Sequence, residues 1–120
     1  MVFMFENLQV YRKAVDFADE VTCAAETFPR GYHFLVDQLN RAALSISANI
    51  AEGNGRFTKA DRRNFFTIAR GSTHECIPLL ELAFRRGFIT PSRHCELRAK
   101  LEEIAKMLAG LIQGLDNRKI

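Results

Sequence analysis

A short run in the middle of the chain combines nucleophile and base side chains. The run Gly71-Ser72-Thr73-His74-Glu75-Cys76 offers hydroxyl, imidazole, carboxylate and thiol groups, which are the groups that acyl-transfer enzymes use. Ser72 and His74 are only two residues apart in a segment of helical periodicity, so they point in different directions. The run also lacks the strand-to-helix turn of a G-x-S-x-G nucleophile elbow. We therefore expect no catalytic residue and no enzymatic activity, and interpret Ser72 as a small residue that admits a neighbouring helix.

The histidines and cysteines could in principle bind a metal ion. Their positions show no CxxC, HExxH or E-x-x-H spacing, so the sequence predicts no metal site and no cofactor. An odd number of cysteines without such pairs also argues against a disulfide framework and favours a cytoplasmic location. The N-terminus lacks the features of a signal peptide, and no stretch is apolar enough to span a membrane. The residues considered are His33, His74, His94, Cys23, Cys76 and Cys95.

A row of polar residues shares one face of a predicted helix. Ser45, Asn49 and Glu52 follow at i, i+4 and i+7, and Arg41 extends the row by one turn. One interpretation is an internal hydrogen-bond network, with Glu52 pairing to Arg56, because buried polar groups need partners. The alternative is a row that faces a ligand or RNA. The predicted structural polar network consists of Arg41, Ser45, Asn49, Glu52 and Ser72.

Apolar residues recur at spacings of three and four along the whole chain, which indicates helices rather than strands. The clearest stripe, spaced 4-3-4-3-4, is Leu97, Leu101, Ile104, Leu108, Leu111 and Leu115. We predict a single domain over residues 1–120, with helices at about 8–28, 34–52, 59–86 and 91–115. Because the connections are short, successive helices should be antiparallel, giving an all-α, up-down-up-down four-helix bundle.

Several residues predict where these helices begin, bend and end. Gly53 suits the left-handed position after the second helix. Thr58, with Asp61 three residues later, resembles a capping box, and Thr90 is a predicted N-cap. Pro78 lies inside the third helix and lacks an N–H donor, so we expect a kink, or alternatively a break into two helices.

The first and third helices each carry a second apolar stripe beside the first. One stripe is enough for a bundle seam. The second stripe either thickens the core or forms a subunit interface, and the sequence leaves both open. The second stripes are Leu8, Tyr11, Val15, Ala18 and Ala25 in the first helix, and Phe66, Ile77, Leu80 and Phe84 in the third.

Charge is distributed unevenly over the chain, whose net charge is +3. Residues 1–54 carry 4 Lys/Arg and 7 Asp/Glu, whereas residues 55–120 carry 13 and 7. An antiparallel bundle brings the starts of the first and third helices to the ends of the second and fourth. Two helix N-termini there add partial positive charge. This end is a candidate polyanion surface, with a mixed solvated surface as the alternative. Its acidic residues are Glu6, Glu52, Asp61 and Asp116, and the predicted nucleic-acid-binding residues are Arg12, Lys13, Arg56, Lys59, Arg62, Arg63, Arg118 and Lys119.

The segment Gln38–Gly53, which includes Ser45-Ile46-Ser47-Ala48-Asn49-Ile50-Ala51-Glu52-Gly53, is distinctive, as is Gly55-Arg56 after it. Together with Phe5–Val10, Phe28-Pro29 and Ile68–Ser72, it resembles the family of 23S rRNA intervening-sequence proteins over nearly the whole chain. The chain departs from the family pattern at Tyr11, where Trp is common, at Asn40, where a basic residue is common, and near Gly31, where an acidic residue is common.

The resemblance implies a four-helix bundle without enzymatic activity that assembles into a ring, expected to be a homopentamer. Together with the basic surface, it implies a nucleic-acid-associated protein whose expected partner is RNA, in particular 23S rRNA, or another nucleic acid, or a ribosomal component. A related branch serves as the accessory protein of diversity-generating retroelements, where a basic pentamer binds nucleic acid and a reverse transcriptase. The alternative function is therefore a protein-interaction adaptor for such an enzyme.

Overall fold

The computed structural model describes residue 1 and residues 3–117, and within these it contains helices and no strands. A short 3₁₀ helix, η1 (Met4–Asn7), precedes four α-helices: α1 (Gln9–Ala25), α2 (His33–Asn54), α3 (Lys59–Arg85) and α4 (Pro91–Asp116). The predicted all-α fold is confirmed. Two residues of the predicted nucleic-acid surface, Arg118 and Lys119, lie outside the described residues.

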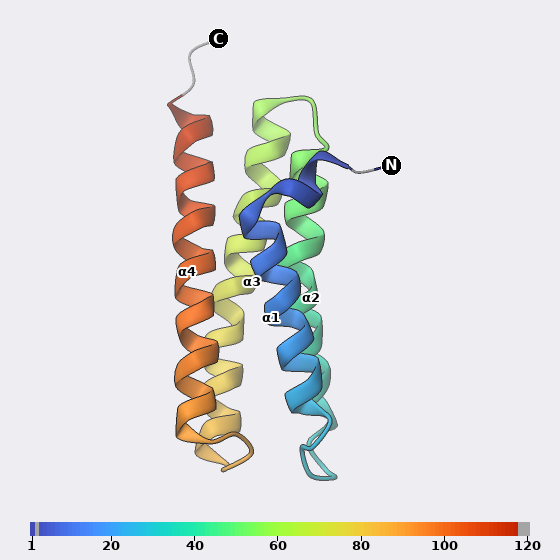
Figure 1. Cartoon of the computed structure of the whole chain (residues 1–120), viewed down its shortest axis with the longest axis vertical. Helices are drawn as coiled ribbons and strands as arrows, with labels where there is room; N and C mark the ends of the chain where they lie inside the picture. Colours follow the sequence, from blue (N-terminus) through green and yellow to red (C-terminus); the bar gives the residue numbers. More distant parts are fainter. Residues whose placement is uncertain (2, 118–120) are drawn as a thin grey trace.

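The four helices form a closed bundle in which each helix contacts its two neighbours. Figure 1 shows that α1 and α3 run in one direction and α2 and α4 in the other. Contacts between helix starts and helix ends agree with this arrangement. Arg86 at the end of α3 donates to the Tyr32 hydroxyl before α2 at 2.9 Å. At the opposite end, Arg63 of α3 pairs with Asp116 of α4 at 2.7 Å. The bundle is elongated, with extents of 52 × 29 × 21 Å.

The core is built from the apolar stripes read in the sequence. Its largest fully buried side chains come from all four helices, which bury one face each and leave the charged face to water. In the residues described, no helix has the length and apolar character needed to cross a membrane. The core includes Phe17 and Val21 of α1, Leu35, Leu39, Ile46 and Ile50 of α2, Phe66 and Leu80 of α3, and Leu97, Leu101, Ile104 and Leu108 of α4.

Most helix boundaries fall close to the predicted ones, but α1 ends at Ala25 rather than near residue 28. After Ala25 the hydrogen bonds span three residues instead of four, as in the bond from the Phe28 N–H to the Ala25 carbonyl at 3.1 Å. Phe28 precedes Pro29, and the residue before a proline is disfavoured in the α conformation. The chain therefore leaves the helix before the proline is reached.

Gly53 does not occupy a left-handed position, so that prediction is wrong. It lies inside α2, and in the described residues the only positive φ angles belong to Gly31 and Gly87. A Cβ built on Gly53 would lie 2.8 Å from the Phe66 ring and 3.0 Å from the Phe65 Cβ. The glycine is thus explained by the close approach of α2 and α3, not by its backbone angles.

Side-chain caps define the starts of the last two helices. The Thr58 hydroxyl accepts from the Asp61 N–H at 3.1 Å, and the Thr90 hydroxyl accepts from the Arg93 N–H at 3.1 Å. Each bond satisfies one of the unpaired N–H groups of a helix N-terminus. Pro78 lies within α3, which continues as one helix from Lys59 to Arg85, so the alternative of two helices is wrong.

The second apolar stripes pack largely into the bundle. On α3, Phe66 and Leu80 are buried, and Ile77 and Phe84 pack against the core. On α1 the stripe is buried or partly buried except for Val15, whose side chain is 40% exposed. These stripes therefore thicken the core. The large exposed apolar side chains of the helices lie mainly elsewhere: Phe34 and Leu44 on α2, and Ile68 and Leu82 on α3.

Candidate nucleic-acid interface

Four of the predicted nucleic-acid-binding residues gather where α2 passes into α3. Arg56 lies in the connecting loop, and Lys59, Arg62 and Arg63 lie in the first turns of α3. The end of α4 reaches the same region, since Lys59 and Arg63 both contact Asp116. The N-terminus of α3 adds partial positive charge to this cluster. We call these four residues the basic end.

The cations of the basic end also have partners within the protein. Arg63 makes a two-pronged contact with Asp116, at 2.7 Å from Nε to Oδ1 and 3.3 Å from Nη2 to Oδ2. The hydrogen bond from Arg63 holds the pKa of the Asp116 carboxyl below its ordinary value and, in turn, raises the pKa of Arg63. Arg56 pairs with Glu52 at 2.8 Å and lies over the Phe65 ring, 4.6 Å from its centroid. Exposed pairs of this kind contribute little stability and can exchange partners.

Arg62 has a structural role that its sequence position does not reveal. Its Nη1 donates to the Asn54 carbonyl at 3.2 Å and to the Arg56 carbonyl at 3.4 Å. Asn54 is the last residue of α2, where helix carbonyls lack partners, and Arg56 lies in the loop that follows. The Arg62 side chain is half-buried. It therefore ties the end of α2 to the start of α3 and is a poor position at which to test ligand contact alone.

The two predicted cations of α1 contact η1 and α4 rather than the residues of the basic end. Arg12 donates to the Glu6 carbonyl of η1 at 2.9 Å. Lys13 pairs with Glu103 at 2.9 Å, and Glu103 lies near the middle of α4. Because α1 is the shortest of the four α-helices and begins lower along the bundle, its start is not level with that of α3 (Figure 1). The sequence could not reveal this offset.

The predicted polar network falls into separate parts. The hydroxyls of Ser45 and Ser72 are 2.8 Å apart across the α2–α3 interface, and the Asn49 amide donates to the Ser45 hydroxyl at 2.9 Å and to its carbonyl at 2.8 Å. Glu52 pairs with Arg56 instead. Arg41 is exposed and makes no hydrogen bond or ion pair in the described chain, but it lines the same hollow of about 310 Å³ as Ser45 and Ser72. The hydroxyls thus hold two helices together and are occupied by one another.

The side chains that follow Ser72 likewise point to different sides of α3. His74 and Glu75 are exposed, whereas Cys76 is buried in the core. Burial, helped by the nearby Glu75 carboxylate, raises the pKa of the Cys76 thiol to about 12. In the described part of the chain, no group of three or more His, Cys, Asp or Glu side chains could hold a metal ion.

Sequence reasoning missed a groove between α3 and α4 that continues from the basic end. Its volume is about 280 Å³. Arg70 lines it and makes no hydrogen bond or ion pair within the described chain. Arg70 follows Arg63 by seven residues, so both lie on one face of α3; that spacing was the available signal. The groove is lined by Arg63, Thr67, Arg70, Ala109, Ile112, Gln113 and Asp116.

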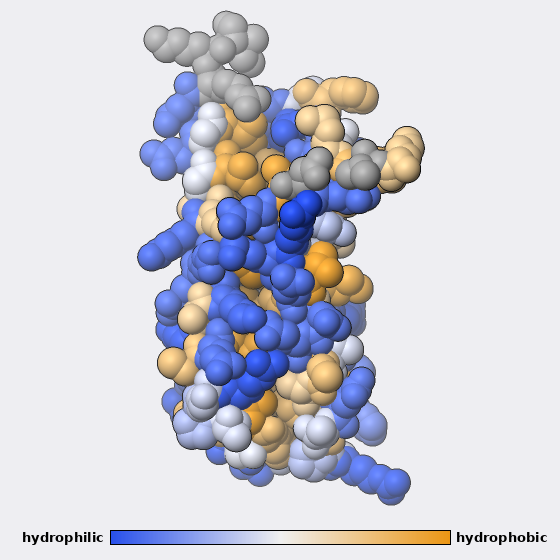
Figure 2. Space-filling model, in the orientation of Figure 1, coloured by the Kyte–Doolittle hydropathy of each residue, from blue (hydrophilic) through white to orange (hydrophobic). Residues whose placement is uncertain are grey.

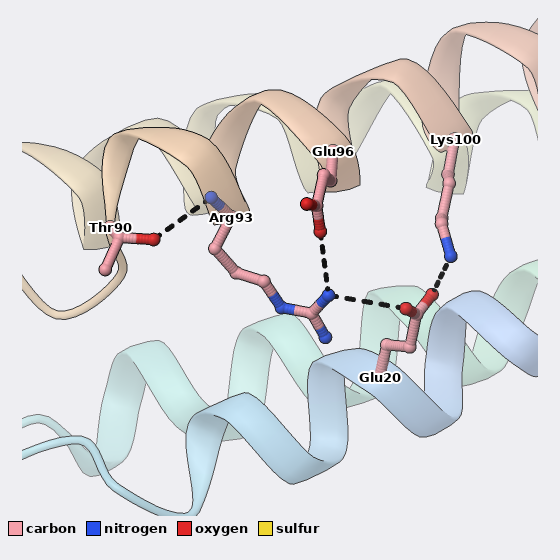
Figure 3. A network of polar contacts seen from close by, with 5 residues as sticks. All are labelled: Glu20, Thr90, Arg93, Glu96 and Lys100. Atoms are coloured by element: carbon pink, nitrogen blue, oxygen red, sulfur yellow. Dashed lines mark hydrogen bonds and ion pairs between the residues drawn. The ribbon is translucent and has the colours of Figure 1, made fainter.

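A second feature not predicted is an ionic seam between α1 and α4. Glu20 of α1 lies between Arg93 and Lys100 of α4, and Arg93 also contacts Glu96 at 3.2 Å (Figure 3). Partial burial raises the pKa of Glu20, but the hydrogen bonds and charges of Lys100 and Arg93 outweigh it, so the pKa is lowered. Figure 2 shows the corresponding face, which is mostly hydrophilic with small separate hydrophobic areas.

Known proteins with similar sequences and structures indicate the family of this bundle. The family model of 23S rRNA-intervening sequence proteins matches residues 6–110. The chain belongs to this family. A crystal structure of a protein of unknown function from the S23 ribosomal protein family of Bacteroides thetaiotaomicron VPI-5482 is similar, with a TM-score of 0.80 and 28% sequence identity. The similarity covers 86% of this chain and 97% of that one. No curated protein matches the chain.

Proposed function

We propose that this member of the 23S rRNA-intervening sequence family is a non-enzymatic, cytoplasmic RNA-binding protein that acts as an oligomer, with 23S rRNA or a ribosomal component as its partner. The observation that carries the proposal is the basic end, where Arg56, Lys59, Arg62 and Arg63 surround the N-terminus of α3. Guanidinium and ammonium groups beside a helix N-terminus bind phosphate oxygens. The family name points to RNA as the polyanion.

The pairing of these cations is compatible with RNA binding. The Arg63–Asp116 and Arg56–Glu52 pairs are exposed. An exposed ion pair contributes at most about 1 kcal/mol, so a phosphate can replace the carboxylate at little cost. Contacts to phosphate carry no sequence information and release counterions, so binding should be sequence-tolerant and should weaken as salt rises.

We propose that the protein is not an enzyme because its candidate nucleophiles and bases do not lie together. The Ser45 and Ser72 hydroxyls pair with one another, and His74 is exposed on another face of α3. A nucleophile needs a base within hydrogen-bond reach.

A titration of a labelled oligouridylate across salt concentrations tests the proposed function. We expect affinity to fall steeply with salt, and the double variant Arg56→Glu/Arg63→Glu to bind much more weakly while keeping its helical circular dichroism. The matched control is Arg30→Glu/Arg85→Glu, which changes the charge equally at the opposite end, where both arginines are exposed. Absence of binding at low salt, or binding that salt does not weaken, would refute the proposal.

The oligomer is proposed as a ring, expected to be a homopentamer. Exposed apolar side chains on α2 and α3 support it, since apolar surface is commonly covered by association. Leu44 is 63% exposed and Phe34 is 58% exposed. In a ring, the basic end would be repeated by symmetry, and several weak contacts would act together.

The same exposed apolar face favours a second candidate function, an adaptor for a protein such as a reverse transcriptase. Phe57, fully exposed in the loop beside the basic end, could serve either partner. The gene neighbourhood separates the two candidates, because a 23S rRNA gene supports the first and a reverse-transcriptase gene with a variable repeat supports the second. Co-purification with the neighbouring gene's product then tests the adaptor directly.

A further inference from the structure

We infer that the groove between α3 and α4 is the path of a single RNA strand, with Arg70 and Lys106 as its phosphate contacts. The inference rests on the proposed function and deepens it, since neither residue belongs to the basic end. It extends the binding surface from the basic end along one side of the bundle.

The register of the two helices places the cations along one line. Arg63 and Asp116 are paired, and in antiparallel helices Arg70, seven residues later, lies level with Ala109, seven residues earlier. Lys106 precedes Gln113 by seven residues, so it lies on the same face of α4 as that lining residue. Seven residues of α-helix span about 10 Å, which carries positive charge well down the groove from the basic end.

The charges in this groove are available to a ligand. Arg70 and Lys106 are exposed, and neither makes a hydrogen bond or ion pair within the described chain. This contrasts with the basic end, where Arg62 holds the backbone and Arg63 holds Asp116. The acidic neighbours of the groove are already paired, Asp116 with Arg63 and Glu102 with Arg98. Free cations beside neutralised carboxylates favour an anionic ligand.

The remaining lining suits a nucleotide chain. The Gln113 amide is exposed and has no partner within the described residues, so it can bond to a base or ribose. The Thr67 hydroxyl donates to the Arg63 carbonyl at 2.7 Å, which leaves its oxygen free to accept. Ala109 and Ile112 provide an apolar floor. A positively charged groove that follows the backbone is the usual means of binding single strands.

The small size of the groove favours single strands over duplexes. Its volume is about 280 Å³, so it can take part of one strand, whereas a double helix is far too wide to enter it. A duplex could touch only the outer rim.

The test measures binding of a labelled oligouridylate, alone and as a duplex with oligoadenylate, to the full chain. We expect Arg70→Ala/Lys106→Ala to lower single-strand affinity by at least about tenfold and the salt slope by about 1.4, the change for two lost contacts on a single strand. Arg30→Ala/Arg85→Ala should bind like wild type. Because Arg70 and Lys106 have no partners, their variants should keep the wild-type melting temperature and mass.

The outcomes separate this inference from the proposed function. If wild type binds, Arg56→Glu/Arg63→Glu loses binding and Arg70→Ala/Lys106→Ala does not, the groove assignment fails and the proposed function stands. If wild type does not bind, both fail. Tighter binding of the duplex than of the single strand overturns the groove path. A change in particle mass in the Arg70→Ala/Lys106→Ala variant also overturns it, because the groove would then be an interface between copies.

Discussion

At the scale of single residues, Gly53 is the glycine at which an added side chain has the least room. Its Cα faces the ring of Phe66, a buried side chain that cannot swing into solvent. A methyl group at this position forces α2 and α3 apart or moves the ring, and overpacking of this kind costs about 1–3 kcal/mol. The gain in helix propensity from alanine, about 1 kcal/mol, offsets only part of it.

We therefore predict that Gly53→Ala lowers the free energy of unfolding by about 1 kcal/mol, measured by urea denaturation. Gly110→Ala is the matched control, because Gly110 lies inside α4 and a Cβ there meets nothing within 4 Å. That variant should be stabilised by about 0.5–1 kcal/mol. Equal effects of the two substitutions would show that propensity, not the contact with Phe66, governs Gly53.

Residue roles were predictable where they follow from local spacing or from the stripes along the helices. The Thr58 and Thr90 caps are local, and both form as the sequence indicates. The Ser45 and Ser72 contact required only that two small polar residues lie on facing stripes. The role of Arg62 depends on the path of the loop before it, and that of Gly53 on the distance between two helices. Neither quantity is encoded in periodicity.

At the scale of elements, the α1–α4 contact differs from the other helix contacts. Three ion pairs cross it, from Lys13 to Glu103 and from Glu20 to both Arg93 and Lys100. The α2–α3 contact is instead the most extensive and is closed by Gly53, Phe66 and the serine pair. The four helices and their directions follow from periodicity and short loops. The offset of α1, which decides which charges meet α4, does not.

Glu20 makes this seam sensitive to acid. Its pKa in the folded protein lies below the ordinary 4.5, so its stabilisation is present above about pH 4.5 and is lost as pH falls through the folded pKa. We predict that Glu20→Gln destabilises the protein by about 1 kcal/mol or less at pH 7, because the pairs are largely solvent-screened. The difference from wild type should shrink in urea denaturation below pH 4.5. Glu102→Gln, which breaks only a pair within α4, is the control. A difference independent of pH would contradict the assignment.

At the scale of the whole molecule, the single chain exposes two kinds of surface on different sides, one with unpaired cations and one with apolar side chains. The α3–α4 side carries unpaired positive charge at Arg70 and Lys106. The exposed apolar side chains lie on the outer surfaces of α2 and α3, where Ile68 precedes Ser72 by one turn and so faces the α2 side of α3. If the apolar side is covered by neighbouring copies, the charged groove remains open in each copy. Association and RNA binding would then use different surfaces and could be altered separately.

This separation gives a test of the proposed ring. We predict that Leu44→Lys/Ile68→Lys reduces the particle from several chains to one in light scattering, while the circular dichroism is retained, because both side chains are already exposed in the protomer. Val15→Lys, at a similarly exposed position on α1, should leave the mass unchanged. Dissociated chains should still bind oligouridylate, but more weakly, since the contacts of separate copies no longer act together. A wild-type protein that is monomeric at all concentrations would contradict the proposed ring. Dissociation by Val15→Lys alone would instead place the interface on α1.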